Sequence, residues 1–280
     1  MATTALGLRD LIVQLTGSAE DEARLAVATR IAETFGAHLI GVHLHTLPDV
    51  LEITDPLQSG TIRNLLDASD READRTFEIA ARRFDAITAS HELRRLHGMA
   101  VDLGTDLAAM ARAADLFIGT RPYGDPSGHT QIEERVAFGS GRGCLFLPPG
   151  GSAHVDFKVI TVAWDGSREA ARAVAEAMPF LARAEAVHLV TISPAFDDID
   201  ADKHFAHLVA HLGRYGVKAE TTALPYSSGA GEQIEQFAHQ RGSDLVVMGA
   251  YGHGRMVEWI FGGATRYLLR HSTLPILMAH

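Results

Sequence analysis

One pattern of predicted strands and helices occurs twice along this chain, and this repetition constrains the fold more than any other feature. Apolar runs at 9–16 and 157–165 both end in a Gly-Ser pair, Gly17-Ser18 and Gly166-Ser167. An Ala-rich helical pattern follows each pair, so both serines are expected to be helix N-caps. The constant spacing between the two copies predicts that the halves of the chain share one architecture.

The rest of the repeat extends this agreement to the end of each half. Further strands are expected near 38–44, 91–97, 115–119 and 144–147, and again near 187–192, 218–224, 244–249 and 275–279. Helices are expected near 19–35, 62–85 and 104–113, and near 168–183, 200–215 and 230–241, with a final helix before each closing strand. Such alternation is typical of parallel βαβ units with right-handed crossovers. We therefore predict two tandem Rossmann-like or flavodoxin-like α/β domains, at 1–149 and 153–280, joined by the Pro- and Gly-rich segment 148–152.

Composition excludes several classes of function. The 280 residues carry a formal charge of −10, which argues against nucleic acid as a partner because phosphate backbones require basic surfaces. No apolar run approaches the roughly 18 residues of a membrane helix, and no secretory signal is apparent, so neither a membrane nor an exported protein is expected. The single Cys144, within an apolar strand, is interpreted as a core residue of a protein in the reducing cytoplasm.

A glycine-rich stretch follows the fourth strand of the second half. Gly249, Gly252 and Gly262 give the spacing G-x2-G-x9-G, with Gly254 between them and Gly263 directly after. Glycines let backbone amides approach an anion, and helix N-termini add unpaired donors. The stretch therefore predicts a phosphate cradle that ends before a helix at 264–271.

This spacing, placed directly after a strand that ends in Met-Gly, resembles the nucleotide-binding signature of the universal stress protein family. The resemblance implies strand order 3-2-1-4-5 in each five-stranded parallel sheet, pairing between the two closing strands, and ATP as the ligand, with magnesium as a candidate companion. The family motif continues with Ser or Thr where this chain has Gly263, and Thr265 is the nearest hydroxyl. That departure weakens the expected site and leaves nucleotide binding open.

The predicted nucleotide site gathers strand ends from the second half. In an open parallel sheet, ligands bind beyond the carboxyl ends of the strands where strand order reverses. Asp165 is expected to accept a hydrogen bond from the ribose or the base, although it could instead cap the following helix. The full set of expected binding residues is Ala163, Asp165, Ile192, Met248, Gly249, Gly252, Gly254, Gly262, Gly263 and Thr265.

The first half does not repeat this motif. Thr16 stands where the second half has Asp165, and Pro122 and Tyr123 would crowd a backbone cradle. This half is expected to bind another small ligand or to act as a pairing partner. His43 and His45, at a strand end, are interpreted as packing or loop residues.

Other chemistries have weaker signals. His204, His207 and His211 lie on one face of a predicted helix and are candidate metal ligands, but a His-rich surface helix is the favoured explanation. No catalytic set is identified, since no nucleophile elbow, Walker A lysine, HExxH or CxxC occurs.

We therefore expect a stress-response protein that binds ATP or a related nucleotide and acts as a nucleotide-responsive regulator. The alternatives left open are a non-nucleotide adaptor or small-ligand carrier and a very slow ATPase. A homodimer is also compatible with the sequence.

Overall fold

The structure, a computed structural model, describes residues 7–48, 59–122, 130–151, 156–193, 201–227, 229–250 and 258–280. The first half runs β1 (Asp10–Leu15), α1 (Glu20–Phe35), β2 (His38–Thr46), α2 (Ser59–Phe84), β3 (His91–Gly98), α3 (Ala100–Ala111), β4 (Leu116–Thr120), α4 (Thr130–Gly139) and β5 (Gly143–Leu147). The second half runs β6 (Val159–Ala163), α5 (Arg168–Leu181), β7 (Ala186–Ser193), α6 (Ala201–Arg214), β8 (Ala219–Pro225), α7 (Ala230–Gln240), β9 (Leu245–Gly249), α8 (Glu258–His271) and β10 (Ile276–Ala279).

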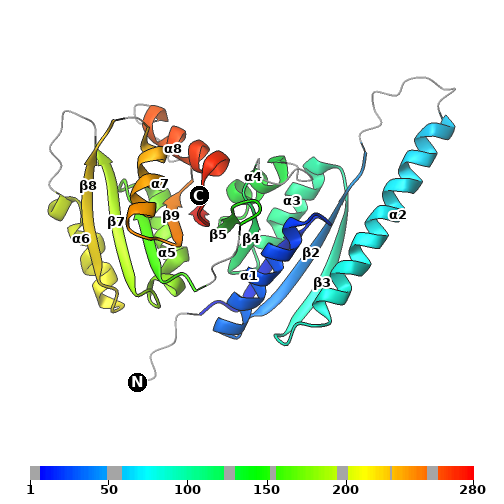
Figure 1. Cartoon of the computed structure of the whole chain (residues 1–280), viewed down its shortest axis with the longest axis horizontal. Coiled ribbons are helices and arrows are strands. Elements are labelled where there is room, and N and C mark those ends of the chain that lie inside the picture. The colour runs from blue at the N-terminus through cyan, green and yellow to red at the C-terminus, as the bar shows by residue number, and fades with distance from the viewer. Residues whose placement is uncertain are drawn as a thin grey trace.

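The ten strands of the described residues lie in one sheet, in the order β3-β2-β1-β4-β5-β10-β9-β6-β7-β8. The strands labelled in Figure 1 follow this order, from β8 at the left to β3 at the right. Read from its outer edge towards the centre of the sheet, each half has the order 3-2-1-4-5, and its internal pairings are parallel. The predicted fold class, tandem Rossmann-like α/β units with five parallel strands each, is therefore confirmed, and the two sets of strands join into one sheet. At the centre β5 and β10 pair antiparallel, with Cys144 opposite Met278.

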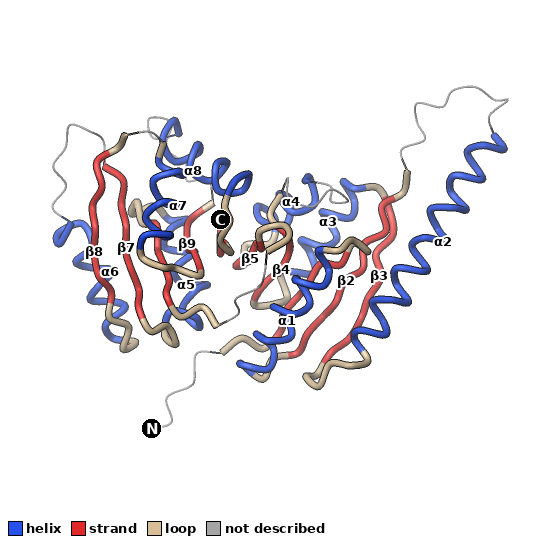
Figure 2. The backbone as a smooth tube through the Cα atoms, in the orientation of Figure 1, coloured by secondary structure: helices blue, strands red, loops and turns tan. Residues whose placement is uncertain are grey.

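Helices cover both faces of the sheet (Figure 2). One buried cluster joins one face to α1, α2, α5 and α6, and a second cluster joins the other face to α3, α4, α7 and α8. Alternation along β1 explains the division, because Leu11, Val13 and Leu15 belong to the first cluster and Ile12 to the second. Each cluster contains residues of both halves, so apolar burial holds the halves together as well as the central strand pair.

Contacts between the halves extend beyond the sheet. The rings of Phe35 in α1 and Phe180 in α5 meet edge to face, with centroids 5.7 Å apart. On the other face Arg121, just after β4, donates from Nε to the carbonyl of Ser272 at 3.1 Å and from a terminal nitrogen to that of Leu269 at 3.0 Å. The same guanidinium also reaches the carbonyl of Arg270. Arg121 thus caps the carboxyl end of α8, where cations are favourable.

Two local expectations were wrong. The helix expected at 264–271 begins at Glu258, so Gly262 and Gly263 lie inside α8 and not in a break before it. Ser18 is not the N-cap of α1: Ala19 occupies that position, and the Ser18 hydroxyl, one residue earlier, accepts a hydrogen bond from the amide of Glu20 at 3.3 Å. Ser167 does cap α5, accepting a hydrogen bond from the Ala170 amide at 3.1 Å, as predicted.

Within the part of the chain that the structure describes, no helix combines the length and apolar character that crossing a membrane requires. Most of the segment 46–62, between β2 and the first turn of α2, lies outside the described residues.

Candidate functional site

A small cavity lies at the carboxyl ends of β6 and β9, where the strand order of the second half reverses. Its volume is about 20 Å³. Five of the expected binding residues line it, together with two others that the sequence analysis did not include: Ala163, Asp165, Met248, Gly249 and Thr265, then Ser167 and Ile234. The sheet thus brings together side chains from β6, the loop after it, β9, α7 and α8.

Asp165 lies in a tight turn between β6 and α5. Its Oδ1 accepts a hydrogen bond from the amide of Ser167 at 2.9 Å, and Gly166 between them has φ = 76°. That positive φ favours glycine, which explains why both copies of the repeat have Gly at this position. Asp165 therefore stabilises the turn through one carboxylate oxygen, and the turn places the carboxylate at the cavity.

Gly249 ends β9 against the first turn of α5. A Cβ at this position would lie 2.6 Å from the amide nitrogen of Ala170 and 2.7 Å from the carbonyl carbon of Glu169. Real side chains do not approach backbone so closely, and only glycine fits here. The end of β9 is thereby held beside the start of α5, which closes one side of the cavity.

The remaining expected residues lie elsewhere or outside the described chain. Ile192 is buried in the core at the end of β7 and does not line the cavity. Gly252 and Gly254 lie outside the described residues. Within α8, Gly263 is exposed, and an added Cβ would have no neighbour within 4 Å. In an α-helix the first four backbone amides have no acceptor within the helix. Since α8 begins at Glu258, these four amides precede Gly262, so the amides of Gly262 and Gly263 are not among the free donors of this helix.

The equivalent crevice in the first half is larger and polar. A cavity of about 370 Å³ lies at the carboxyl ends of β1 and β2, against α2. Its lining includes Gln14, Thr16, His43, His45, Ser69, Glu72 and Thr76. Buried Gln14 donates to Glu133 Oε1 at 2.7 Å, so polar groups meet deep inside this half.

His43 is the most perturbed group in this crevice. Burial lowers the pKa of its imidazole to about 4, because the charged ring would lose its hydration. Its Nε2 lies 2.9 Å from the hydroxyl of Thr76, and its Nδ1 is buried without a hydrogen-bond partner. His43 is thus neutral at pH 7, and one of its ring nitrogens is buried with no hydrogen-bond partner among the described residues.

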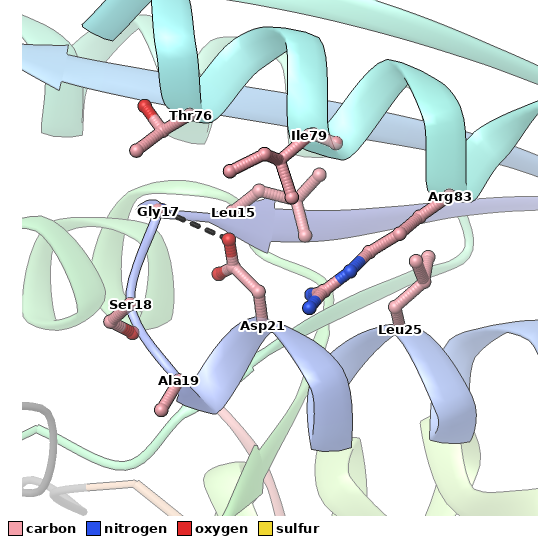
Figure 3. Close-up of a pocket in the computed structure, with 10 residues that line it drawn as sticks. Leu15, Gly17, Ser18, Ala19, Asp21, Leu25, Thr76, Ile79 and Arg83 are labelled. Carbon is pink, nitrogen blue, oxygen red and sulfur yellow. Dashed lines mark hydrogen bonds between the residues drawn. The ribbon is translucent and has the colours of Figure 1, made fainter. Parts of the chain in front are cut away.

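A further cavity of about 200 Å³ lies between α1 and α2 (Figure 3). It shares the lining residues Gly17 and Thr76 with the polar cavity of about 370 Å³. Asp21 accepts hydrogen bonds from the amides of Thr16 and Gly17, both at 2.9 Å. In Figure 3 the guanidinium of Arg83 extends from α2 towards Asp21. The first half therefore holds Asp21 where its carboxylate organises the turn after β1, a role that Asp165 has in the second half.

The three histidines of α6 show no joint site among the described side chains. His207 and His211 are exposed, the ring of His204 packs edge to face on Phe205, and that of His211 lies against Tyr215. The described group of potential ligands whose atoms lie within 4.8 Å of one another is a different one, in the first half.

Comparisons with known proteins agree with this architecture. Residues 156–280 match the sequence model of the Universal stress protein family. Universal stress protein Slr1230 of Synechocystis sp. (strain ATCC 27184 / PCC 6803 / Kazusa) is 28% identical over 152 residues, which cover 51% of this chain. The match covers 49% of that relative, so the chain spans about half the length of the curated protein it matches.

Solved structures share the fold over nearly the whole chain. A universal stress protein from Archaeoglobus fulgidus DSM 4304 superposes with a TM-score of 0.72 at 15% identity, covering 96% of this chain and 95% of the other. A functionally unknown protein from Pseudomonas aeruginosa PAO1 superposes with a TM-score of 0.58 at 15% identity, covering 97% and 92%. At such identity the likeness concerns the fold, and function depends on the site.

Proposed function

Because the chain belongs to the universal stress protein family, we propose that it is a stress-response protein that binds ATP or a related nucleotide in its second half. Binding at Gly249–Thr265 would change the affinity for a partner protein. The two halves, 1–149 and 153–280, are proposed as two domains of one cytoplasmic protein that pair through β5 and β10. The first half then serves as the fixed partner of the responsive half.

One observation carries the proposal: Asp165, Met248 and Thr265, from distant parts of the sequence, line one cavity at the strand-order reversal. Apolar Ala163 and Met248 suit the face of a base, and a carboxylate suits a ribose hydroxyl or a base amino group. We assign the second oxygen of Asp165 to the ligand, since Oδ1 already accepts from Ser167.

The phosphates are assigned to the glycine motif and the first turn of α8. The cavity of about 20 Å³ is far smaller than a nucleotide, so the phosphates must extend beyond it towards 250–258. A helix that begins at Glu258 offers amides of its first turn to an anion. In this assignment Gly262 and Gly263 no longer donate hydrogen bonds to the phosphates. Gly252 and Gly254 keep their proposed role, which is to let the phosphates come close to the backbone because glycine has no side chain.

Titration calorimetry with ATP, with and without magnesium, tests the proposal on the full chain. We expect micromolar binding, weakened at least tenfold in Asp165→Asn and in Gly252→Val. Glu185→Gln is the matched control: it removes one carboxylate charge at the amino end of β7, where Glu185 pairs with Lys158 at 2.8 Å. No binding by the wild type after denaturation and refolding, or equal binding by Asp165→Asn, would refute the assignment.

A carrier of another small ligand is the second candidate, and the polar cavity of about 370 Å³ in the first half favours it. Mass spectrometry of material released from the purified protein separates the two functions. A nucleotide supports the first, and a different compound with no nucleotide supports the second. Phosphate release from ATP that persists in Asp165→Asn would identify any hydrolysis as contamination.

A further inference from the structure

Two histidines on neighbouring strands of the first half face each other. Parallel pairing of β2 and β3 places His45 opposite His97, near the carboxyl ends of both strands. Their Nδ1 atoms lie 2.8 Å apart. Asp70, from α2, places Oδ1 3.8 Å from the His45 Nδ1. The ligand atoms of the three residues all lie within 4.8 Å of one another.

A serine fixes the orientation of one ring. The Nε2 of His45 lies 2.9 Å from the hydroxyl of Ser69 in α2. When Nε2 carries the proton and donates it to Ser69, the Nδ1 of His45 presents a lone pair towards His97 and Asp70. A hydrogen bond from the outer ring nitrogen is also what orients histidines that bind metals.

We propose that His45, His97 and Asp70 bind a divalent transition-metal ion, for which Zn²⁺ is the best fit. Imidazole nitrogens and one carboxylate oxygen are ligands that zinc accepts, and three protein ligands leave a position for water. Metal–ligand bonds of about 2.0–2.1 Å in a tetrahedral arrangement separate ligand atoms by about 3.3 Å. The two histidine nitrogens, 2.8 Å apart, would separate by about 0.5 Å, and the Asp70 oxygen, 3.8 Å from the Nδ1 of His45, would approach that nitrogen by about 0.5 Å. The side chains of Asp70 and His97 are exposed, so rotamer adjustment allows these shifts.

Burial and charge around the cluster are compatible with an ion. The His45 side chain is 7% exposed, whereas that of Asp70 is 55% exposed, so one side is fixed and the other is open for entry. Arg95, on the same strand as His97, pairs with Asp74 at 2.5 Å, and this carboxylate offsets its charge. His45 and Ser69 also line the polar cavity of about 370 Å³, which gives a bound ion access to water or to a small oxygen ligand.

This site is independent of the nucleotide proposal. The cluster belongs to β2, β3 and α2, at the outer edge of the first half of the sheet (Figure 1), whereas β6 and β9 lie in the second half. Loss of nucleotide binding in the second half would leave the zinc prediction unchanged.

Zinc titration of the full chain, after removal of metals with a chelator, tests the proposal. We expect one Zn²⁺ per chain, and affinity at least tenfold weaker in His97→Gln and in Asp70→Asn. His91→Gln is the matched control, because His91 lies at the other end of β3 and its Nδ1 contacts the carbonyl of Ala89. His207→Gln tests the α6 histidines. Equal zinc affinity in His97→Gln, or loss of binding in His207→Gln, would overturn the assignment.

Two further readouts separate a built site from adventitious binding. Zinc should raise the thermal unfolding temperature of the wild type and of His91→Gln, and raise it less in His97→Gln, since an ion that binds the folded chain stabilises it. Cobalt as a substitute should give the intense visible absorption of a four-coordinate centre in the wild type and not in His97→Gln. A weak six-coordinate spectrum that is the same in both would contradict the proposal.

Discussion

Replacing Gly231 by Ala should destabilise the protein, although alanine is the better helix former. Gly231 is buried in α7, where it meets α8. An added Cβ would lie 2.7 Å from the Cβ of Tyr267, 2.9 Å from the carbonyl oxygen of Ala264 and 3.0 Å from its Cα. Two of these three neighbours are backbone atoms, so α8 itself must move to make room.

Overpacking of this kind costs about 1–3 kcal/mol, and the gain in helix propensity returns about 0.5–1 kcal/mol. The free energy of unfolding should therefore fall by about 1 kcal/mol, within a range of about 0–2.5 kcal/mol. Since α8 carries Thr265 and α7 carries Ile234 to the cavity, nucleotide affinity should fall as well.

Urea denaturation followed by circular dichroism measures the effect. Gly213→Ala in α6 is the matched control, because a Cβ there has no neighbour within 4 Å. This variant should be unchanged or more stable by up to about 1 kcal/mol. If Gly231→Ala were as stable as Gly213→Ala, the close approach of α7 and α8 would be refuted.

Three further predictions follow from single residues. Gly263→Ser restores the family hydroxyl at a position with free space, so ATP affinity measured by calorimetry should rise by about two- to tenfold; an unchanged or lower affinity would exclude a phosphate near this position. Arg121→Ala removes donors from three carbonyls at the end of α8, so the free energy of unfolding in urea should fall by about 1–3 kcal/mol, with little rescue by Arg121→Lys. Burial raises the pKa of the Cys144 thiol to about 12, so iodoacetamide should label it at pH 8 only after unfolding, and rapid labelling of the native protein would contradict this. The contribution of this thiol to stability should also decline as pH rises above about 9, because the thiol of the unfolded chain ionises there while the buried one does not.

The fold was predictable because two independent copies of one pattern support each other. Any single strand, such as Leu245–Gly249, is ambiguous as a short apolar run, but its counterpart Leu116–Thr120 occupies the same place in the other half. The start of α8 was predicted too late, because Gly262 and Gly263 have low helix propensity and indicate a break in the helix. Packing of that helix against α7, and burial of Ala264 and Leu268 in the second cluster, override the local preference.

The sequence predicted the candidate site of the second half, where the glycine spacing after the fourth strand resembles a family motif, but not the histidine cluster of the first half. Asp165, Met248 and Thr265 were expected to meet because strand ends converge at the point where strand order reverses. Ile234 was missed, since its periodic apolar position in α7 is that of an ordinary core residue. His45 and His97 were not linked because 52 residues separate them, and only the register of β2 and β3 places them face to face.

Methyl NMR of the methionine-labelled protein tests the central claim most directly. The chain has seven methionines. Met248 lines the second-half cavity, whereas Met178 is buried in α5 on the other face of the sheet and serves as the internal control. Addition of ATP should shift the Met248 methyl signal in a saturable way and leave that of Met178 in place, and Asp165→Asn should require more ATP for the same shift. A Met248 signal that stays unchanged at saturating ATP would contradict nucleotide binding in the second half.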